Sequence, residues 1–425
     1  MGYARPVGPG FSPLDEELAL LPGDLSPTVA EGVTRLGTWM PFGPAARLLG
    51  FFWGVAVSES SVRRQTESAG AAYVAVQAAE RERVDREGAE PPPGPPIQQL
   101  SLDGAMVPLV GGEWAEVKTA VIGTVTTRRG PEGPEVHTEH PSYFSRLADA
   151  ATFTQEVGIE LFTRGTASAG TVVAVSDGAE WIQGVVDTYR RDAIRILDFP
   201  HAVEHLTGAS QAIWGVGSAA ARTWVTTHAH TLKHDDPEDV LAALRDLPVA
   251  EATDPVAAAA VQEAALRYLT TRREHIQYAT FQAQGYPIGS GAVESANKLT
   301  VEARMKGSGM HWARCHVNPL LALRTVACAE RWASAWPLIC QELRRRRQAH
   351  RQAPVQATHP AAPPTPLSAA AVKSVVGRKP ARPTTLHQPP RQHPPMVVHG
   401  TPTANHPWRQ AAHDAARANA AKQAG

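Results

Sequence analysis

The sequence predicts a mixed α/β fold in which a β-sheet core is flanked by helical regions. From residue 97 to 125, apolar and polar side chains alternate with a period of two, which is typical of antiparallel strands. The run TVVAVS (171–176) is continuously apolar and rich in β-branched residues, which is typical of a buried parallel strand. Residues 26–88 and 207–284 instead repeat apolar side chains at helical spacing.

Composition excludes two classes of protein. The chain has 425 residues, 43% of them hydrophobic, with 41 basic and 41 acidic side chains. This length suffices for two or three domains, and ordinary apolar content with zero net charge excludes a wholly disordered protein. Three cysteines are too few for a disulfide scaffold.

The zero net charge is a sum of two unequal parts. Residues 344–425 carry 13 Lys/Arg and one acid, Asp414, which leaves 28 basic and 40 acidic residues in 1–343. An acidic body of about −12 is therefore joined to a basic tail of about +12. The tail is rich in Pro and Ala without apolar periodicity, so we expect it to be disordered from 344 onward.

The first elements are helical. After an N-terminal arm (1–25), Ser26 and Pro27 form a capping pair for a first helix, and a further helix begins at Ser58. That helix carries Arg63 and Arg64, so residues 26–88 have the outline of a helix-turn-helix that contacts DNA. Any helical hairpin has the same outline, and that reading stays open. A Pro-rich linker (89–96) follows.

The core begins after the linker. We expect strands over 97–103, 105–110 and 114–125, a helix over 143–162, a strand over 171–176, a helix over 181–189 and a strand over 193–197. Three antiparallel strands followed by βαβ crossovers predict a mixed sheet with helices on both faces.

The region of strands and helices (97–206) is followed by a region (207–284) with an almost entirely helical pattern. The next region (285–343) opens with a Gly-rich loop followed by a helix over 292–306. No window is apolar enough to span a membrane and the start of the chain has no secretory signal, so we expect a cytoplasmic, nucleoid-associated protein.

Three acids occupy comparable positions. Asp103 is expected to end the first strand, Asp177 ends the buried strand, and Glu294 opens the helix after the Gly-rich loop. Carboxylates that converge repel one another unless a cation is present, and hard oxygen ligands suit Mg²⁺ or Mn²⁺. Two such ions could stabilise a phosphoryl transfer. The alternative is that the aspartates are turn residues and Glu294 only faces the helix dipole.

A second group of polar residues surrounds these acids. Asp198 either caps the helix that follows it or competes with Asp177 as the second acid, and His201 lies one turn into that helix. We prefer Asp177 because it ends the more apolar strand.

The helix of Glu294 carries the remaining candidates. Asn297 and Lys298 follow Glu294 at i+3 and i+4 and so share its face. With Arg304 and Lys306 they would border a phosphate backbone. Trp312 either stacks on a base or lies in the core.

The sequence resembles bacterial insertion-sequence transposases of the ISKra and ISLre type, relatives of the Mutator-like DDE transposases. Matching stretches occur in this order: LDGAMV (102–107), VAVSDGAEWI (173–182), ILDFPHAVEHL (196–206), GYPIGSGAVESANK (285–298) and ARMKGSGMHW (303–312). The resemblance covers residues 11–336. A Cys-rich motif common at the N-terminus of such proteins is absent here, and the tail has no counterpart.

The resemblance implies an RNase H-like core with a helical insertion before the last acid. It implies that Asp103, Asp177 and Glu294 form a DDE triad holding two Mg²⁺ or Mn²⁺ ions, and that Asp198 and His201 form an accessory Asp-x-x-His motif. The implied partners are element-end DNA, target DNA and further copies of the chain. Two alternatives remain: a catalytically silent DNA-binding protein derived from a transposase, and an RNase H-like nuclease without strand transfer.

Overall fold

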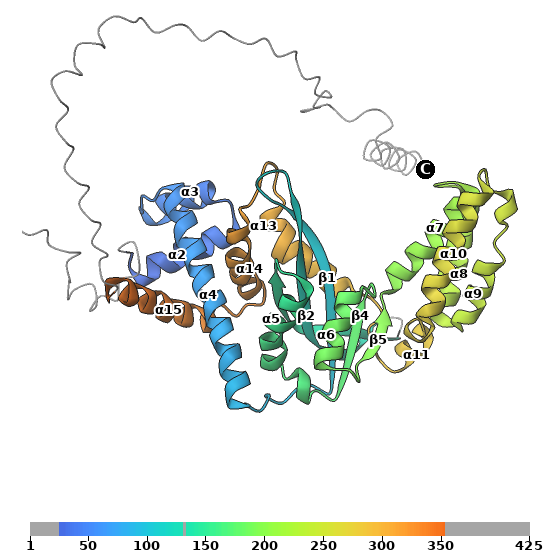
Figure 1. The fold of residues 1–425 in the computed structure, drawn as a ribbon, viewed down its shortest axis with the longest axis horizontal. Coiled ribbons are helices and arrows are strands. Elements are labelled where there is room, and N and C mark those ends of the chain that lie inside the picture. The colour runs from blue at the N-terminus through green and yellow to red at the C-terminus, as the bar shows by residue number, and fades with distance from the viewer. Residues whose placement is uncertain (1–24, 131–132, 353–425) are drawn as a thin grey trace, which may run out of the picture. The chain divides into compact units, whose positions relative to one another are not determined.

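The computed structural model describes residues 25–130 and 133–352, and its centre is a five-stranded sheet (Figure 1). The strand order is β3-β2-β1-β4-β5. Strand β1 pairs antiparallel with β2 and parallel with β4, β2 pairs antiparallel with β3, and β4 pairs parallel with β5. The predicted mixed sheet and its β-β-β-α-β-α-β element order are confirmed. The strands are β1 (Ile97–Pro108), β2 (Trp114–Gly130), β3 (Gly133–Arg146), β4 (Thr171–Ser176) and β5 (Ile194–Leu197).

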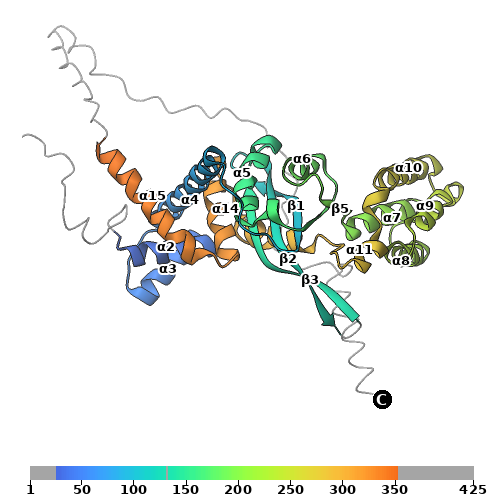
Figure 2. The same ribbon diagram turned by 90° about the horizontal axis from the view of Figure 1, so that it is seen from below.

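The third strand is not where we expected it. Strand β1 continues through Pro108 because Gly104 pairs with Lys118 without interrupting the ladder. The third strand is instead β3, which occupies the predicted start of a helix at 143. The helix α5 (Ala150–Thr163) begins only after Asp149, whose carboxylate accepts from the Thr152 N–H at 2.8 Å. The far ends of β2 and β3 project from the sheet (Figure 2).

Helices cover both faces of the sheet. On one face, α5 and α6 (Glu180–Tyr189) pack on β1, β2 and β4 through buried side chains that include Leu100, Leu102 and Phe153. The opposite face receives α12 (Gly291–Ala296), whose Val293 packs on Val121. Alternation along β1 therefore directs Asp103 away from the α5 face and toward the side of α12.

The N-terminal helices are α2 (Pro27–Trp39), α3 (Phe42–Trp53) and α4 (Glu59–Glu87). The expected caps form, since Ser26 and Ser58 accept from the N–H groups of Val29 and Ser61. Helix α4 is a single helix of 29 residues rather than a short recognition helix. Its Gly70 lies so close to the Pro319 backbone that a Cβ atom would stand 2.1 Å from the Pro319 carbonyl oxygen. The N-terminal helices are thus joined to the C-terminal ones.

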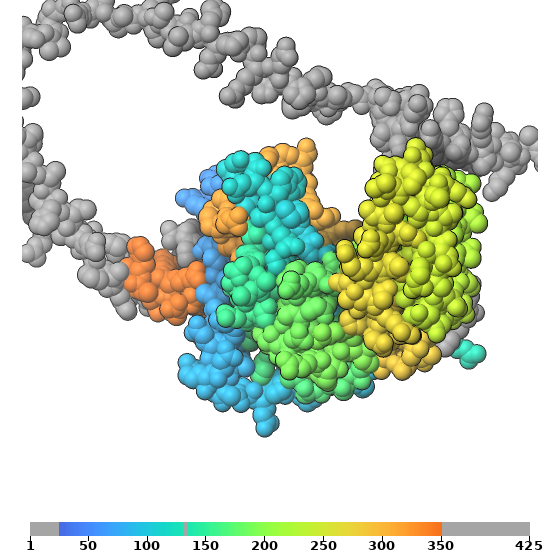
Figure 3. All heavy atoms as spheres, turned by 45° about the vertical axis from the view of Figure 1, so that its right-hand side comes forward, coloured from blue at the N-terminus to red at the C-terminus, as the bar shows by residue number. Residues whose placement is uncertain are grey.

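The insertion is a group of five helices that shares a core with β4 and β5. Its atoms, yellow in the space-filling view, form a lobe next to the green atoms of the sheet region (Figure 3). The expected boundary at residue 207 falls inside its first helix, which begins at Phe199. Tyr278 fixes the last helix to the sheet by donating its hydroxyl to the Leu197 carbonyl at 2.9 Å. The helices are α7 (Phe199–Trp214), α8 (Ala219–His234), α9 (Pro237–Arg245), α10 (Pro255–Thr271) and α11 (Tyr278–Ala283).

The chain ends, within the described residues, in α14 (Arg314–Cys328) and α15 (Trp332–Gln352). Our expectation of a disordered tail from 344 was wrong for its first nine residues. Glu342 holds Arg345 and Arg346 at 2.6 and 2.7 Å, and Arg346 donates to the Ala71 carbonyl at 3.0 Å. The rest of the tail (353–425) and the arm (1–24) lie outside the described residues. No helix in the described ranges is long and apolar enough to cross a membrane.

Candidate active site

Asp103 lies beyond the point where the parallel pairing of β1 stops. The last parallel pair joins Ser101 to Val175, whereas Asp103 still pairs antiparallel with Thr119. Asp103 therefore lies inside β1, whereas we had expected it at the end of the first strand. Its carboxylate accepts two hydrogen bonds, from the Gly104 N–H at 2.7 Å and from the Asn297 side-chain amide at 2.8 Å.

Asp177 is the first residue after β4, as expected. Its carboxylate accepts from the Ala179 N–H at 2.9 Å, and Gly178 adopts a positive φ of 78°, which turns the chain toward α6. Two side chains of α10 and its cap contact this turn: the Tyr268 hydroxyl donates to the Asp177 carbonyl, and Arg272 donates to the Gly178 carbonyl at 3.2 Å. The insertion thus holds the loop of the second acid, which the sequence had not indicated.

Glu294 lies in the first turn of α12 and its side chain is exposed. The preceding loop is fixed by Asp198, whose carboxylate accepts from the Ser290 N–H at 2.6 Å. The Ser290 hydroxyl in turn lies 3.5 Å from a Glu294 carboxylate oxygen.

The three acids are electrostatically coupled. Burial is the largest cause of the raised pKa of Asp103, and the neighbouring carboxylates of Asp177 and Glu294 raise it further. The hydrogen bonds from Gly104 and Asn297 oppose this shift. Residues separated widely along the chain are therefore close enough for their charges to repel.

Asn297 contributes a further polar atom to this region. It is 5% exposed, and its side-chain oxygen has no hydrogen-bond partner in the described structure. A buried acceptor without a donor costs free energy unless a water or a cation satisfies it. Carboxylate and amide oxygens are the donor set that Mg²⁺ prefers, so the chemistry of these residues fits such an ion. In the described ranges, no three His, Cys, Asp or Glu side chains are already placed to ligate one metal ion.

Asp198 has a structural role. It is 5% exposed, and besides holding the Ser290 N–H it caps α7 by accepting from the His201 N–H at 3.1 Å. His201 lies 3.3 Å from Glu204 and packs edge-on against Tyr268.

The helix after Glu294 is irregular. Residues Asn297–Glu302 (η4) are π-helical, between α12 and α13 (Ala303–Met305). A π-helical turn displaces carbonyls from their ordinary partners. Arg324 of α14, which is 2% exposed, donates to the carbonyls of Leu299 and Thr300 and carries the Trp39 ring 4.5 Å from its guanidinium. No sequence pattern indicated this arginine.

Three of the predicted DNA contacts are buried. Asn297 is bonded to Asp103. Arg304 is 2% exposed, donates to the Gly37 carbonyl at 3.2 Å and lies against the ring of Trp312. Trp312 itself is 7% exposed and donates to the Met305 carbonyl at 3.1 Å. The expectation that Asn297 and Arg304 contact DNA is therefore corrected, because both side chains are buried. For Trp312, the alternative of a place in the core is the one that the structure shows.

The remaining basic candidates are exposed. Lys298 lies one turn from Glu294, and Lys306 pairs with Glu302 at 2.7 Å. Arg63 and Arg64 are exposed at the start of α4.

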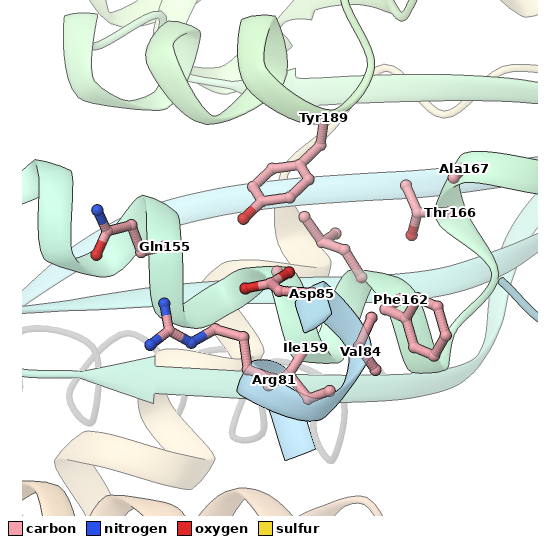
Figure 4. A pocket seen from close by; sticks show the side chains of 11 residues that line it. Arg81, Val84, Asp85, Gln155, Ile159, Phe162, Thr166, Ala167 and Tyr189 are labelled. Carbon is pink, nitrogen blue, oxygen red and sulfur yellow. The ribbon is translucent and has the colours of Figure 1, made fainter. Parts of the chain in front are cut away.

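A cavity of about 260 Å³ lies elsewhere, between the C-terminal part of α4, α5 and the end of α6 (Figure 4). Its lining is mostly apolar, and Tyr189, Arg81 and Asp85 reach into it. None of the predicted site residues lines it.

Comparison with protein-family profiles found no match, and comparison with curated proteins found no significant match.

Proposed function

We propose that this protein is a DNA transposase that cleaves and joins DNA strands with the aid of divalent metal ions. The observation that carries the proposal is the hydrogen bond from Asn297 to Asp103, which brings the helix of Glu294 to the strand of the first acid. In addition, the carboxylates of Asp177 and Glu294 contribute to the raised pKa of Asp103. A mixed sheet of this strand order, followed by helices that separate it from the last acid, supports an RNase H-like core. Transposase-like stretches throughout residues 11–336 support the same proposal.

The site residues have different roles in this proposal. Asp103, Asp177 and Glu294 would hold Mg²⁺ or Mn²⁺, with Asn297 fixing one oxygen of Asp103 and offering its own free oxygen. Bound ions supply charge stabilisation for the attacking and leaving oxygens of a phosphoryl transfer. The protein's own contribution is to hold the acids and the DNA in register. Lys298, and Arg63 and Arg64 on α4, are the exposed cations that would contact phosphates.

A nuclease without strand transfer is the second candidate, because the same acids would serve hydrolysis alone. A catalytically silent DNA-binding protein is the third. In the same reaction mixture, each of these two candidates predicts an outcome that differs from that of a transposase.

The test is a strand-transfer assay with labelled DNA from either side of the gene, a plasmid target and Mg²⁺. We expect nicked and joined products from the wild-type protein. Asp177→Asn should reduce both by at least ~10³-fold, since removing one electrostatic element from such a site costs ~10²–10³ and a metal ligand more. Asp246→Asn, an exposed acid of the insertion, is the matched control and should retain full activity.

The outcomes separate the three candidates. Nicking without joining identifies the nuclease, and binding without either reaction identifies the silent protein. Full activity of Asp177→Asn contradicts the assigned triad.

A further inference from the structure

Five consecutive exposed residues at the end of α3, Gly50–Gly54, form what we call the aromatic tip. Phe51 is 80% exposed, Phe52 68% and Trp53 50%. Large apolar side chains that gather at one surface point mark a binding site more often than scattered ones do.

The local structure explains why these rings face solvent. Gly54 ends α3 in the left-handed conformation at φ 65°, with its N–H bonded to the Gly50 carbonyl. Trp53 packs against α2, since a Cβ atom on Gly32 would stand 2.1 Å from its ring. Phe51 and Phe52 contact each other edge-on with centroids 5.0 Å apart. The tip is thus anchored by Trp53 and presents two phenylalanines.

The charges that lie near the tip in the sequence are mainly positive. From residue 41 to 64 the charged side chains are Arg47, Arg63, Arg64 and a single acid, Glu59, in a body that is otherwise acidic. Arg47 lies one helical turn before Phe51 and shares its face. Within the described residues neither Arg47 nor Arg63 forms an ion pair, and Arg64 donates to the Ser61 hydroxyl at 3.4 Å. Their charges remain available to a polyanion.

We propose that the aromatic tip binds DNA in which bases are unstacked, with Phe51 and Phe52 stacking on the exposed bases while Arg47, Arg63 and Arg64 contact the flanking phosphates. This inference rests on the proposed function and specifies the form of its substrate. Aromatic rings stack on any unpaired base, and arginines beside them track the backbone. An intact duplex presents phosphates and groove edges to the rings, so it would use only the arginines.

Charge complementarity favours DNA over a second copy of the chain. A two-fold symmetric contact through the tip would bring the same patch of each copy together. Each arginine would then approach arginines of the same sign, which opposes association. A polyanion meets the same cations with attraction.

The experiment compares two fluorescein-labelled DNAs of about 30 base pairs by anisotropy, one fully paired and one with a few unpaired bases at its centre. It uses the full chain in EDTA, so that no cleavage occurs. We expect the wild-type protein to prefer the unpaired probe at least about fivefold. Phe51→Ala/Phe52→Ala should abolish this preference while its affinity for the paired probe stays within about twofold. Val216→Ala, which alters an equally exposed apolar residue of the insertion, is the control and should behave as wild type.

Two results of the binding experiment would overturn the inference: equal affinity of the wild-type protein for both probes, or a retained preference in the double variant. A double variant that changes only from dimer to monomer by light scattering would assign the tip to self-association and also overturn it. Strand transfer is measured separately. If the wild-type protein shows no strand transfer but prefers the unpaired probe, and Phe51→Ala/Phe52→Ala loses that preference, the transposase proposal is contradicted and this one is not.

Discussion

The surroundings of Asp103 disfavour the ionised form of its carboxyl group. Its pKa is raised by burial first and by Asp177 and Glu294 next. A carboxyl group whose folded pKa exceeds its unfolded value, ~3.9, binds its proton more tightly in the folded state. It therefore contributes stability at low pH, and that contribution is lost as the pH rises through the folded pKa. At neutral pH the ionised group destabilises the metal-free protein.

Asp103→Asn should therefore stabilise the metal-free protein while abolishing cleavage. We expect a gain of about 0.5–1 kcal/mol at neutral pH, typical of removing functional strain. The Asn297 side chain can rotate so that its free oxygen accepts from the introduced amide. The gain should shrink as the pH is lowered, because protonation then relieves the native site as well. Urea unfolding in EDTA at about pH 7 and about pH 5 measures this, and a loss of stability at the higher pH contradicts it.

Asn297 should set the pH range of the reaction. Its hydrogen bond lowers the pKa of Asp103, so Asn297→Ala should raise that pKa further. We expect the acidic limb of the cleavage–pH profile to move to higher pH. Lys298→Ala, the exposed neighbour, should leave the limb in place, and equal limbs in both variants would refute the role of Asn297.

At the scale of elements, the π-helical segment joins the site to the N-terminal helices. Arg324 satisfies the displaced carbonyls of Leu299 and Thr300 and stacks on Trp39 of α2. Arg304 makes a parallel link to the Gly37 carbonyl. Both guanidinium groups are so buried that their pKa values are lowered, to about 10 for Arg304. The segment that bears Asn297 is thereby held by the N-terminal helices, on which the proposed DNA contacts lie.

Arg324→Met should destabilise the protein by roughly 2–4 kcal/mol, because it removes the charged donor of the Leu299 and Thr300 carbonyls from a buried position. Arg83→Met removes only exposed ion pairs with Glu80 and Glu87, so it should lower stability much less than Arg324→Met does. Guanidinium unfolding followed by circular dichroism gives both values. Equal losses of unfolding free energy in the two variants would show that the contacts of Arg324 with Leu299, Thr300 and Trp39 add no stability.

Elements with a strong local signal were predicted, and those fixed by tertiary contacts were not. The run 171–176 and the cap at Ser58 needed no context, because burial and capping are local properties. Strand β3 was missed because its identity depends on pairing with β2, and Pro141 inside it disguises the alternation. The positions of Asp177 and Glu294 followed from strand ends and loops, whereas the roles of Tyr268 and Arg324 depend on partners far away in sequence.

At the scale of the whole molecule, the basic tail predicted from the sequence is divided by the end of α15. The described part of the chain belongs to one compact unit, and α15 continues to Gln352. Eight Lys/Arg and one acid lie beyond Gln352. The four arginines at 344–347 belong to α15, and Arg346 ties it to α4.

Two truncations separate the structural from the electrostatic part of the tail. Removing 353–425 should change the thermal midpoint by less than about 2 °C but should flatten the salt dependence of DNA binding, since each phosphate contact contributes ~0.9 to the slope. Removing 344–425 should in addition lower the midpoint by several degrees, because the Arg346 contact is lost. Anisotropy at several salt concentrations and differential scanning fluorimetry measure the two effects, and an unchanged slope after the shorter truncation excludes the tail from DNA binding.

The five-helix insertion between Asp177 and Glu294 has a consequence for synthesis of the chain. A ribosome adds ~5–20 residues per second, so Glu294 emerges seconds after Asp177. Arg324, which supports the segment after Glu294, is made later still. A nascent chain holds two acids without the third, and a truncated product holds them permanently. If the protein cleaves DNA as proposed, the order of synthesis withholds that chemistry from the DNA beside the translating ribosome until the polypeptide is nearly complete.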